Sequence, residues 1–289
     1  MNTRHSAVLR SGVALAATCL LASGLAVATE SAAAAAAQPK QRGAIPGIFT
    51  VGCEYSHSAM DDPIVLPGNS GASHLHEFFG NITTDANTTT ASLLAGLTTC
   101  AQPQDHSAYW VPAVIQNGQP IAPVRATVYY RGSKGNTVRP FPAGFKLVTP
   151  RGDRTTHWTC NLANVRVKRS KGTADVPTCT GLERLVAHVR FPSCWDGKNL
   201  DSADHKSHVV YPGKRRVCPA DHSVRLPELV VNVRYPLSVR GGPGIQLSSG
   251  DASSMHADVF SAWSGGRQRH LVRVCLNRHI KCGPAKSVR

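Results

Sequence analysis

Short segments in which apolar and polar residues partly alternate recur along the second half of the chain. β-branched and aromatic residues dominate them, as is typical of half-buried strands. Proline and glycine separate the segments, as in FPAG, TPRGD and RGGPG, and interrupt regular structure. The pattern predicts strands at 124–131 (VRATVYYR), 144–149 (GFKLVT), 185–191 (LVAHVRF), 228–237 (ELVVNVRYPL) and 270–276 (HLVRVCL).

Helical periodicity is scarce, and the best candidate for a short helix is 88–99, TTTASLLAGLTT. Many short strands divided by turns predict a mainly β domain of the β-sandwich or jelly-roll-like kind. Long polar loops would then lie at the rim of a rigid β scaffold. Loops in that position carry functional side chains more often than the core does.

The N-terminus follows a different pattern. Arg4 and Arg10 precede an apolar run at 13–27, and Ala-Val-Ala follows at 26–28. This order is typical of a secretory signal peptide, and the apolar run is shorter than the about 20 residues of a membrane span. We expect a signal peptide at 1–28, a low-complexity leader at 29–43 and one secreted domain at 44–289, with no membrane anchor after cleavage. A domain of roughly 245 residues can form one large core.

Cysteine usage supports an extracellular location. The chain has nine cysteines, and the signal peptide would remove Cys19. An even set of eight in an exported chain indicates disulfides. A zinc site is the alternative, but the sequence has no CxxC pair. Eight cysteines allow 105 pairings, among which we favour sequential ones: Cys53–Cys100, Cys160–Cys179, Cys194–Cys218 and Cys275–Cys282.

The chain is strongly basic, with a formal net charge of +15. Basic residues cluster at 165–172, 213–216 and 265–273. Such a surface is attracted to polyanions, such as an anionic wall polymer or an acidic polysaccharide, and it also keeps a protein soluble. The sequence contains no helix-turn-helix, zinc-finger or aromatic single-strand-binding pattern, so we do not expect nucleic acid as a partner.

Polar residues that can do chemistry gather in four stretches. The first, GASHLHEFFGN at 71–81, contains His74, His76 and Glu77. Residues two apart in an extended segment point the same way, so His74 and His76 could hold one metal ion. This pair supplies only two of the three or four ligands that such a site needs.

The second stretch, SCWDGKNLDSADHKSHVVYP at 193–212, has no helical or strand period of its own. It contains Asp196, Asp201, Asp204, His205 and His208. Aspartates beside glycine often shape turns, which is the structural interpretation of Asp196 and Asp201. If 203–208 forms a helical turn, the two histidines lie on one face. We expect a disulfide at Cys194 and packing of Trp195 to hold this stretch in place.

The third and fourth stretches are CPADHSVRLPEL at 218–229, with His222 and Arg225, and SSMHADVFSAW at 253–263. In the fourth, His256 and Asp258 repeat the two-residue spacing. A single histidine is more often a hydrogen-bonded structural residue than a ligand or a base. Their concentration in a few polar stretches favours a functional role.

These motifs carry a resemblance to a known family. SHLHEFFGN, YWVPA, FPAGFKL, FPSCWDGKNLDSADHKSHVVYP, CPADHSVRLPEL and MHADVFSAW resemble the secreted family catalogued as domain of unknown function number nineteen ninety-six, with members in fungi and actinobacteria. The resemblance runs from about Cys53 to Cys275. It implies a secreted protein in a wall or carbohydrate setting, by association only. The family's last motif usually contains an HGDF-like segment, whereas this chain has HADVF, which keeps His256 and Asp258 without the glycine.

One hypothesis is a hydrolase of extracellular polysaccharide. Glycoside cleavage generally uses two carboxyl groups, for which we select Asp196 and Asp258, with His76 and His208 as proton-transfer partners or orienting groups. Tryptophan rings could stack on the sugars, and the candidates are Trp110, Trp195 and Trp263.

A second hypothesis is a site for one divalent metal ion, built from His74, His76 and His256 and completed by Asp258 or His208. Neutral imidazole suits zinc or copper, and an open coordination position would make the site catalytic. A third is a non-catalytic binder of anionic wall polymer, in which the polar loops form a hydrogen-bonded platform. The sequence leaves open whether the protein is an enzyme. The catalytic and metal hypotheses predict that the side chains of His74, His76, Asp196, His208, His256 and Asp258 converge in one pocket.

Overall fold

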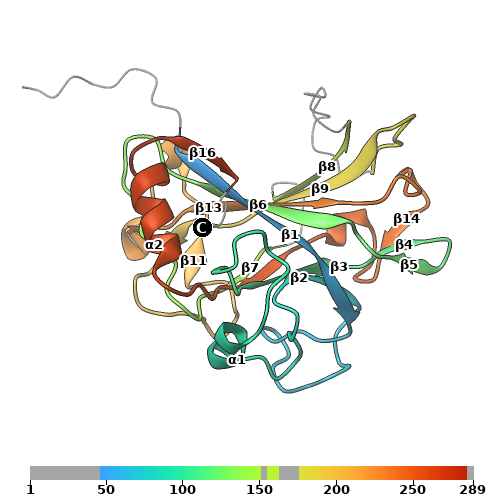
Figure 1. Ribbon diagram of the computed structural model, residues 1–289, viewed down its shortest axis with the longest axis horizontal. Coiled ribbons are helices and arrows are strands. Elements are labelled where there is room, and N and C mark those ends of the chain that lie inside the picture. Colours follow the sequence, from blue (N-terminus) through green and yellow to red (C-terminus); the bar gives the residue numbers. More distant parts are fainter. Residues whose placement is uncertain (1–45, 151–154, 163–175, 285–289) are drawn as a thin grey trace, which may run out of the picture. The chain divides into compact units, whose positions relative to one another are not determined.

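One long strand, β1 (Ile48–Ala59), belongs to both halves of the main sheet. The computed structural model describes residues 46–150, 155–162 and 176–284, all within a compact unit that runs from Arg42 to Arg289. The predicted signal peptide and leader lie outside the described residues. The first part of β1 pairs with β6 (Arg125–Arg131) and, in parallel, with β16 (Lys281–Pro284), whereas its end pairs with β2 (His76–Gly80) (Figure 1).

Two arms extend from this shared strand. One runs through β6, β13 (Glu228–Arg234), β9 (Arg184–Arg190) and β8 (Thr156–Asn161). The other runs through β2, β3 (Ala108–Pro112), β15 (Asp258–Phe260) and β7 (Lys146–Val148). Every pairing within the arms is antiparallel. The predicted mainly β class, with curled antiparallel sheets stabilised by disulfides, is confirmed.

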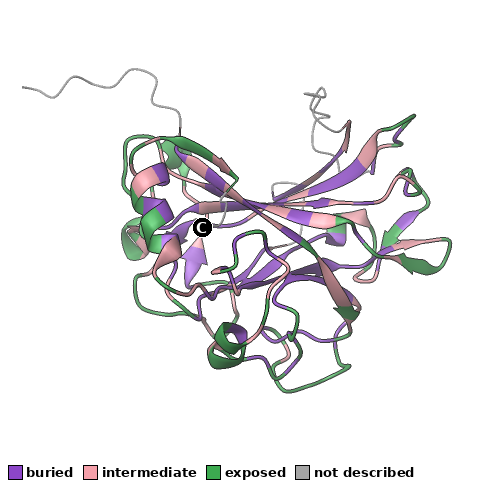
Figure 2. Ribbon diagram, viewed as in Figure 1, coloured by how far each residue is buried: buried purple, intermediate pink, exposed green. Residues whose placement is uncertain are grey.

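The main core fills the space between the arms, where the inward faces meet. Alternation along β6 buries every second residue and leaves the others partly exposed, which is the strand period expected for a sheet with one face in the core. The hydroxyl groups of Tyr109 on β3 and Tyr130 on β6 lie 2.7 Å apart and join the two arms. Figure 2 shows the buried positions along the strands of both arms.

The second arm is also covered on its outer face. Successive residues of β2 and β3 are all buried, because Phe79 and Tyr109 point into the main core and Phe78 and Trp110 point outward. The outward side chains form a second hydrophobic cluster together with Ile64, which lies in the loop between β1 and β2. Side chains on this outer face are therefore sandwiched between the sheet and that loop.

The helical prediction for 88–99 is confirmed by α1 (Thr90–Ala95), where Thr89 and Ser92 form a capping box. The strand predicted at 270–276 is wrong. That segment forms the end of α2 (Arg267–Leu271) and the π-helix η4 (Val272–Leu276). Its buried residues are Leu271, Val272, Cys275 and Leu276. They recur at helical spacing, and the content of valine obscured that period.

The remaining elements are short. β10 (Cys194–Trp195) pairs with β11 (Val209–Val210) and β12 (Val224–Arg225), and β4 (Val114–Gln116) pairs with β5 (Gln119–Ile121) and β14 (Ile245–Leu247). Single 3-10 turns are η1 (Lys214–Arg216), η2 (Ala220–His222) and η3 (Ala252–Ser254). Among the described residues, none of the helices combines the length and apolar character that crossing a membrane requires.

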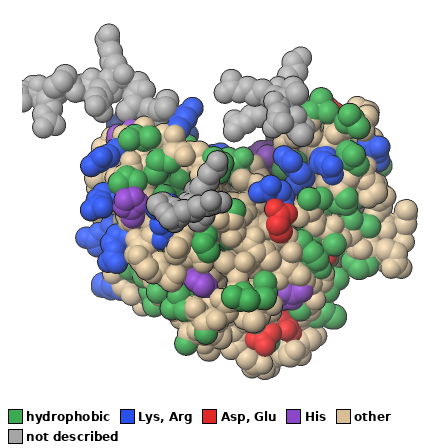
Figure 3. All heavy atoms as spheres, in the orientation of Figure 1, with side chains coloured by type: hydrophobic (Ala, Val, Ile, Leu, Met, Phe, Trp, Pro, Cys, Tyr) green, Lys and Arg blue, Asp and Glu red, His purple; other side chains and the backbone are tan. Residues whose placement is uncertain are grey.

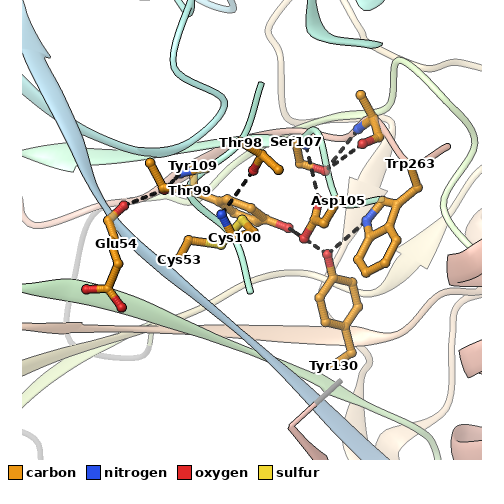
Figure 4. Close-up of a disulfide and its surroundings, with 12 residues drawn as sticks. Cys53, Glu54, Thr98, Thr99, Cys100, Asp105, Ser107, Tyr109, Tyr130 and Trp263 are labelled. Atoms are coloured by element: carbon orange, nitrogen blue, oxygen red, sulfur yellow. Dashed lines mark hydrogen bonds between the residues drawn. A yellow bond between two sulfur atoms is a disulfide. The ribbon is translucent and has the colours of Figure 1, made fainter. Parts of the chain in front are cut away.

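Four disulfides cross-link the fold, and they are the sequential pairs that the sequence favoured: Cys53–Cys100, Cys160–Cys179, Cys194–Cys218 and Cys275–Cys282. Cys53–Cys100 ties β1 to the segment before β3 and lies beside a buried hydrogen-bonded chain of Asp105, Tyr109, Tyr130 and Trp263 (Figure 4).

Basic side chains are unevenly distributed over the surface. On the face drawn in Figure 3, Lys and Arg gather along the left edge, the side on which Figure 1 draws α2, and Asp and Glu are few. The formal charge of +15 therefore includes a local concentration of positive charge, which favours contact with anions there.

Candidate functional site

Strand register brings a group of polar side chains together on the outer face of the second arm. Phe78 on β2, Trp110 on β3 and Asp258 on β15 lie opposite one another, and directly paired residues in antiparallel strands point to the same face. His76 and His256 each precede one of these residues by two positions, so they point to that face as well. Residues far apart in sequence thus meet beneath the loop that joins β1 to β2.

His76 is fully buried, and its surroundings fix its tautomer. Its Nδ1 lies 2.9 Å from the carbonyl oxygen of Asp61. A carbonyl can only accept, so Nδ1 carries the proton and Nε2 of the neutral ring keeps its lone pair. Among the described residues, Nε2 has no hydrogen-bond partner. An imidazole anchored in this way is typical of a metal ligand whose outer nitrogen is held by the backbone.

The His74 and His256 rings lie next to that of His76. The ring centroids are 4.2 Å apart for His74 and His76, 5.2 Å for His74 and His256, and 5.8 Å for His76 and His256. Each histidine offers a ring nitrogen, and these atoms all lie within 4.8 Å of one another. The two-residue spacing therefore places His74 and His76 on one side, as the sequence predicted, and His256 supplies a third imidazole.

His256 is held by its own loop in the same way as His76. Its Nδ1 lies 2.8 Å from the carbonyl oxygen of Ser254, so Nδ1 donates and Nε2 faces Asp258, whose Oδ2 lies 3.8 Å away. Asp258 is almost fully buried. A lone pair and a carboxylate oxygen directed at the same space suit a cation between them.

Asp62 is a further carboxylate at this site, and the sequence analysis missed it. Oxygen and nitrogen atoms of Asp62, His76 and Asp258 lie within 4.8 Å of one another. Asp62 Oδ1 accepts hydrogen bonds from the backbone N–H groups of Ile64 and Val65, at 3.0 and 2.9 Å. The signal was weak, since Asp-Asp-Pro after a strand also fits an ordinary turn.

All of these side chains except His76 border a cavity of about 250 Å³. Its lining includes Asp62, His74, Thr149, Lys206 and Asp258, together with His256. His74 is partly exposed, so the cluster is reachable from outside. The site is thus an opening onto a buried set of nitrogen and oxygen ligands rather than a closed core feature.

Electrostatics keep His76 neutral. Burial lowers the pKa of His76 well below its usual range, and the nearby His74 and His256 lower it further, against a smaller opposing effect from the hydrogen bond to Asp61. Burial raises the pKa of Asp62, although the hydrogen bonds from the backbone N–H groups of Val65 and Ile64 partly offset this increase. A neutral imidazole is the form that binds a metal ion.

Asp196 and His208 do not line this cavity. The Asp196 carboxylate accepts hydrogen bonds from the backbone N–H groups of Lys198 and Asn199, at 2.8 and 3.0 Å, and from the Asn199 side chain at 2.7 Å. His208 is buried, with Nε2 2.8 Å from the Lys146 carbonyl oxygen and Nδ1 3.0 Å from Ser202 Oγ. Asp196 therefore shapes its own turn, and His208 joins its loop to β7.

That loop completes the edge of the sheet. β7 is the last strand of the second arm, and the stretch 193–212 forms hydrogen bonds with the backbone of Lys146 on its free edge. The Lys146 N–H donates to the Leu200 carbonyl at 3.0 Å, and its ammonium group lies 3.0 Å from Asp201. Asp201 also binds His205, and the segment 203–208 forms turns rather than the helical turn considered in the sequence analysis. The polar stretch thus covers an edge that would otherwise be open to pairing.

Of the three tryptophans selected for sugar stacking, two line the same cavity and the third is buried elsewhere. Trp110 is fully buried in the second hydrophobic cluster. Trp195 and Trp263, from separate segments, line one cavity of about 500 Å³ outside the histidine cluster. Cys194–Cys218 and packing of Trp195 against Phe145 hold the stretch 193–212, as expected. His222, from the third stretch, binds Asp221 and the Ser207 carbonyl.

Fold and site together define a disulfide-bonded, mainly β protein with a histidine- and aspartate-lined cavity on the outer face of one sheet arm. The model of the family described as "Domain of unknown function (DUF1996)" matches residues 62–263. The chain belongs to this family, and the match includes the whole histidine cluster. Neither the curated proteins nor the solved structures contain a match.

Proposed function

We propose that this protein is exported and binds one divalent transition-metal ion through His74, His76 and His256, with Asp258 at the same centre. The observation that carries the proposal is the buried His76 Nε2, which lacks a hydrogen-bond partner in the described part of the chain while Nδ1 is fixed by the Asp61 carbonyl. A buried polar atom of this kind is costly unless something binds it. Four disulfides support an extracellular setting.

The ligand set favours zinc or copper. Three imidazoles and a carboxylate suit either ion, since imidazole binds both well. The cavity beside the cluster leaves room for a water or substrate atom near the metal. A zinc ion bound there would activate water as a nucleophile, and copper would supply redox chemistry. The protein's part is to hold three imidazoles close together and to place Asp62 and Asp258 as oxygen ligands or bases.

A two-carboxylate glycosidase mechanism is less well supported by this geometry. Asp258 lies at the cavity, but Asp196 is occupied by its own turn. Partial burial opposes ionisation of Asp196, yet the hydrogen bonds from Lys198 and Asn199 lower its pKa overall. A carboxylate held as an anion does not serve as the general acid that glycoside cleavage requires. If the protein hydrolyses extracellular polysaccharide, the histidine cluster is the better candidate for the reacting centre.

Metal binding can be measured on protein with its disulfides intact, purified without chelator. We expect elemental analysis to find about one zinc or copper ion per chain, since one three-histidine cluster holds one ion. After removal of the metal, titration with Zn²⁺, Cu²⁺ and Co²⁺ by calorimetry and absorption gives the affinity. His76→Ala should weaken it by more than about 100-fold, because loss of an outer-shell partner alone costs 10- to 100-fold.

The matched control is His222→Ala, which removes a histidine that is bound to Asp221 and lies outside the cluster. It should leave the affinity unchanged. His256→Ala removes the imidazole that precedes β15 and provides a second variant in case His76→Ala misfolds. Circular dichroism and the melting temperature report folding. Absence of stoichiometric metal, or equal losses in the His222 and His256 variants, would contradict the proposal.

A further inference from the structure

A second cavity, which shares no lining residue with the cavity beside the histidine cluster, is bordered by aromatic and basic side chains. It is about 500 Å³ and is bordered by Phe141, Trp195 and Trp263, with Arg139, Gln268 and Arg269 as its polar members. A volume of this size is within the range of small-molecule sites. The lining combines aromatic carbon surface with the side chains of two arginines and a glutamine, and neither Asp nor Glu is among the described residues that line it.

The two tryptophans are held so that their carbon surfaces, not their N–H groups, remain for a ligand. Trp195 Nε1 donates to the Asn199 carbonyl at 2.6 Å, and Trp263 Nε1 donates to the Tyr130 hydroxyl at 3.3 Å. Trp263 also packs edge-on against Tyr130, with ring centroids 5.8 Å apart. Figure 4 shows the indole of Trp263 directed at Tyr130, which continues through Tyr109 to the buried Asp105. These contacts hold each ring in one orientation, so a ligand that stacks on it would not have to order it.

Gln268 supplies the observation that points to a ligand. It lies on α2 and is almost fully buried, with 3% of its surface exposed. Its Oε1 accepts the Phe141 backbone N–H at 2.7 Å. The N–H can only donate, so the amide cannot be flipped and Nε2 must be the other end. In the described structure, Nε2 makes no hydrogen bond. A residue that borders the cavity therefore has a buried donor that lacks an acceptor.

Two guanidinium groups at the cavity favour a negatively charged ligand. Arg139 and Arg269 are exposed residues at this cavity. Gly266 leaves space for Arg269, since a Cβ on Gly266 would lie 3.0 Å from a guanidinium nitrogen. Guanidinium groups bind carboxylates in a planar, bidentate manner. An apolar face, a lone amide donor and two guanidinium groups fit a ring that carries hydroxyl groups and a carboxylate.

We propose that this cavity binds an acidic sugar, a uronate residue of an oligosaccharide, with its ring against Trp195 and Trp263. Its hydroxyl or carboxylate oxygens accept from Gln268 Nε2, and its carboxylate pairs with Arg139 and Arg269. The inference does not depend on the metal site, because none of the lining residues belongs to the histidine cluster.

The test uses trigalacturonate as probe, with maltotriose as the neutral control and inorganic sulfate as the anion control, all at one ionic strength. Binding is followed by NMR chemical-shift changes in the full-length protein. Trigalacturonate should bind, with shifts at the indole N–H groups of Trp195 and Trp263, and should bind at least ~10-fold more tightly than either control, the ratio of one hydrogen-bonded charge.

Gln268→Glu is the most specific variant. It keeps an oxygen to accept the Phe141 N–H, replaces the Nε2 donor by an acceptor and adds a negative charge, so we expect at least ~10-fold weaker binding. Trp263→Leu removes one stacking face and provides a second variant in case Gln268→Glu is unstable. Arg269→Gln should also weaken binding, whereas Arg273→Gln, an exposed arginine on the following helical turn and outside the cavity, should not.

Three results would overturn the proposal. The first is that trigalacturonate does not shift the two indole signals. The second is that maltotriose or sulfate binds as tightly as trigalacturonate does. The third is that Arg269→Gln and Arg273→Gln weaken binding equally, which would show general attraction to a basic surface. Because the readout does not involve metal, failure here leaves the histidine cluster untouched, and loss of metal binding leaves this site untouched.

Discussion

The histidine cluster and the stretch 193–212 are both dense in reactive side chains, but they use those side chains differently. In the stretch, Asp196 and Asp204 accept backbone N–H groups two and three residues ahead, and His208 binds the edge strand through Lys146. In the cluster, backbone groups bind Nδ1 of His76, Nδ1 of His256 and Oδ1 of Asp62, but Nε2 of His76 has no partner among the described residues. The polar side chains of the stretch bind backbone groups and stabilise the loop, whereas the cluster gathers nitrogen and oxygen atoms beside a cavity.

The difference shows that residue density alone does not identify a functional site. Asp, Ser and His bind nearby backbone readily when the chain turns, and a long polar loop offers many turns. His76 differs, because it lies on a strand whose own backbone is satisfied by the ladder. Its Nδ1 binds the carbonyl of Asp61 in another segment, and its Nε2 has no partner among the described residues.

The largest expected effect separates the two regions by stability. Cys194→Ser with Cys218→Ser removes the disulfide that closes a sequence separation of 24 residues around the stretch. Loss of such a cross-link costs about 3 kcal/mol of unfolding free energy, measured by urea unfolding. Metal affinity should stay within a few-fold of that of the native protein, because the cluster is anchored on β2 and β15. If the double variant is fully folded but binds the metal much more weakly, the stretch positions the site.

Acidification provides the next contrast. Burial lowers the pKa of His76 from its ordinary 6.5, so the unfolded chain takes up this proton first, and stability falls as the pH drops through 6.5. In Asp201, hydrogen bonds from His205 and Lys146 outweigh partial burial and lower the pKa below 3.8. Its stabilising effect is present above 3.8 and is lost only below that value. The cluster is therefore the acid-sensitive region.

The measurement is urea unfolding of metal-free protein from pH 7 to pH 5, compared with His76→Gln. We expect the native protein to lose up to about 2 kcal/mol relative to the variant over this range, since each tenfold difference in proton binding is worth about 1.4 kcal/mol. Burial raises the pKa of Glu77 and of Asp105 to about 7. Both carboxyl groups remain in the variant, so their opposite contribution cancels in the difference. Parallel curves for the two proteins would show that His76 is not the group that responds.

Much of the fold could be predicted because it is encoded locally. Alternating apolar residues identified β6, β9 and β13, and an even cysteine count with near-sequence pairing identified the disulfides. The prediction failed at 270–276, where valines obscured a helical period. Within the site, the spacing of His74 and His76 predicted a shared face, whereas the meeting with His256 depends on strand register across β2, β3 and β15. Register is set by tertiary packing, so the sequence could not distinguish Asp258, which reaches the cavity, from Asp196, which does not.

The smallest effect is expected from Asp196→Asn. The amide oxygen of asparagine can still accept the N–H groups of Lys198 and Asn199, so the turn persists, whereas the charge and the hydrogen bond from the Asn199 side chain are lost. The side chain is partly exposed, and water screens it, so the stability change should be below about 1 kcal/mol. Metal affinity should not change, whereas Asp258→Asn should weaken it, since an amide oxygen is a poorer ligand than a carboxylate. Calorimetric titration of both variants with Zn²⁺ tests this, and a tenfold loss in Asp196→Asn would place that carboxylate at the metal and remove the distinction between the two regions.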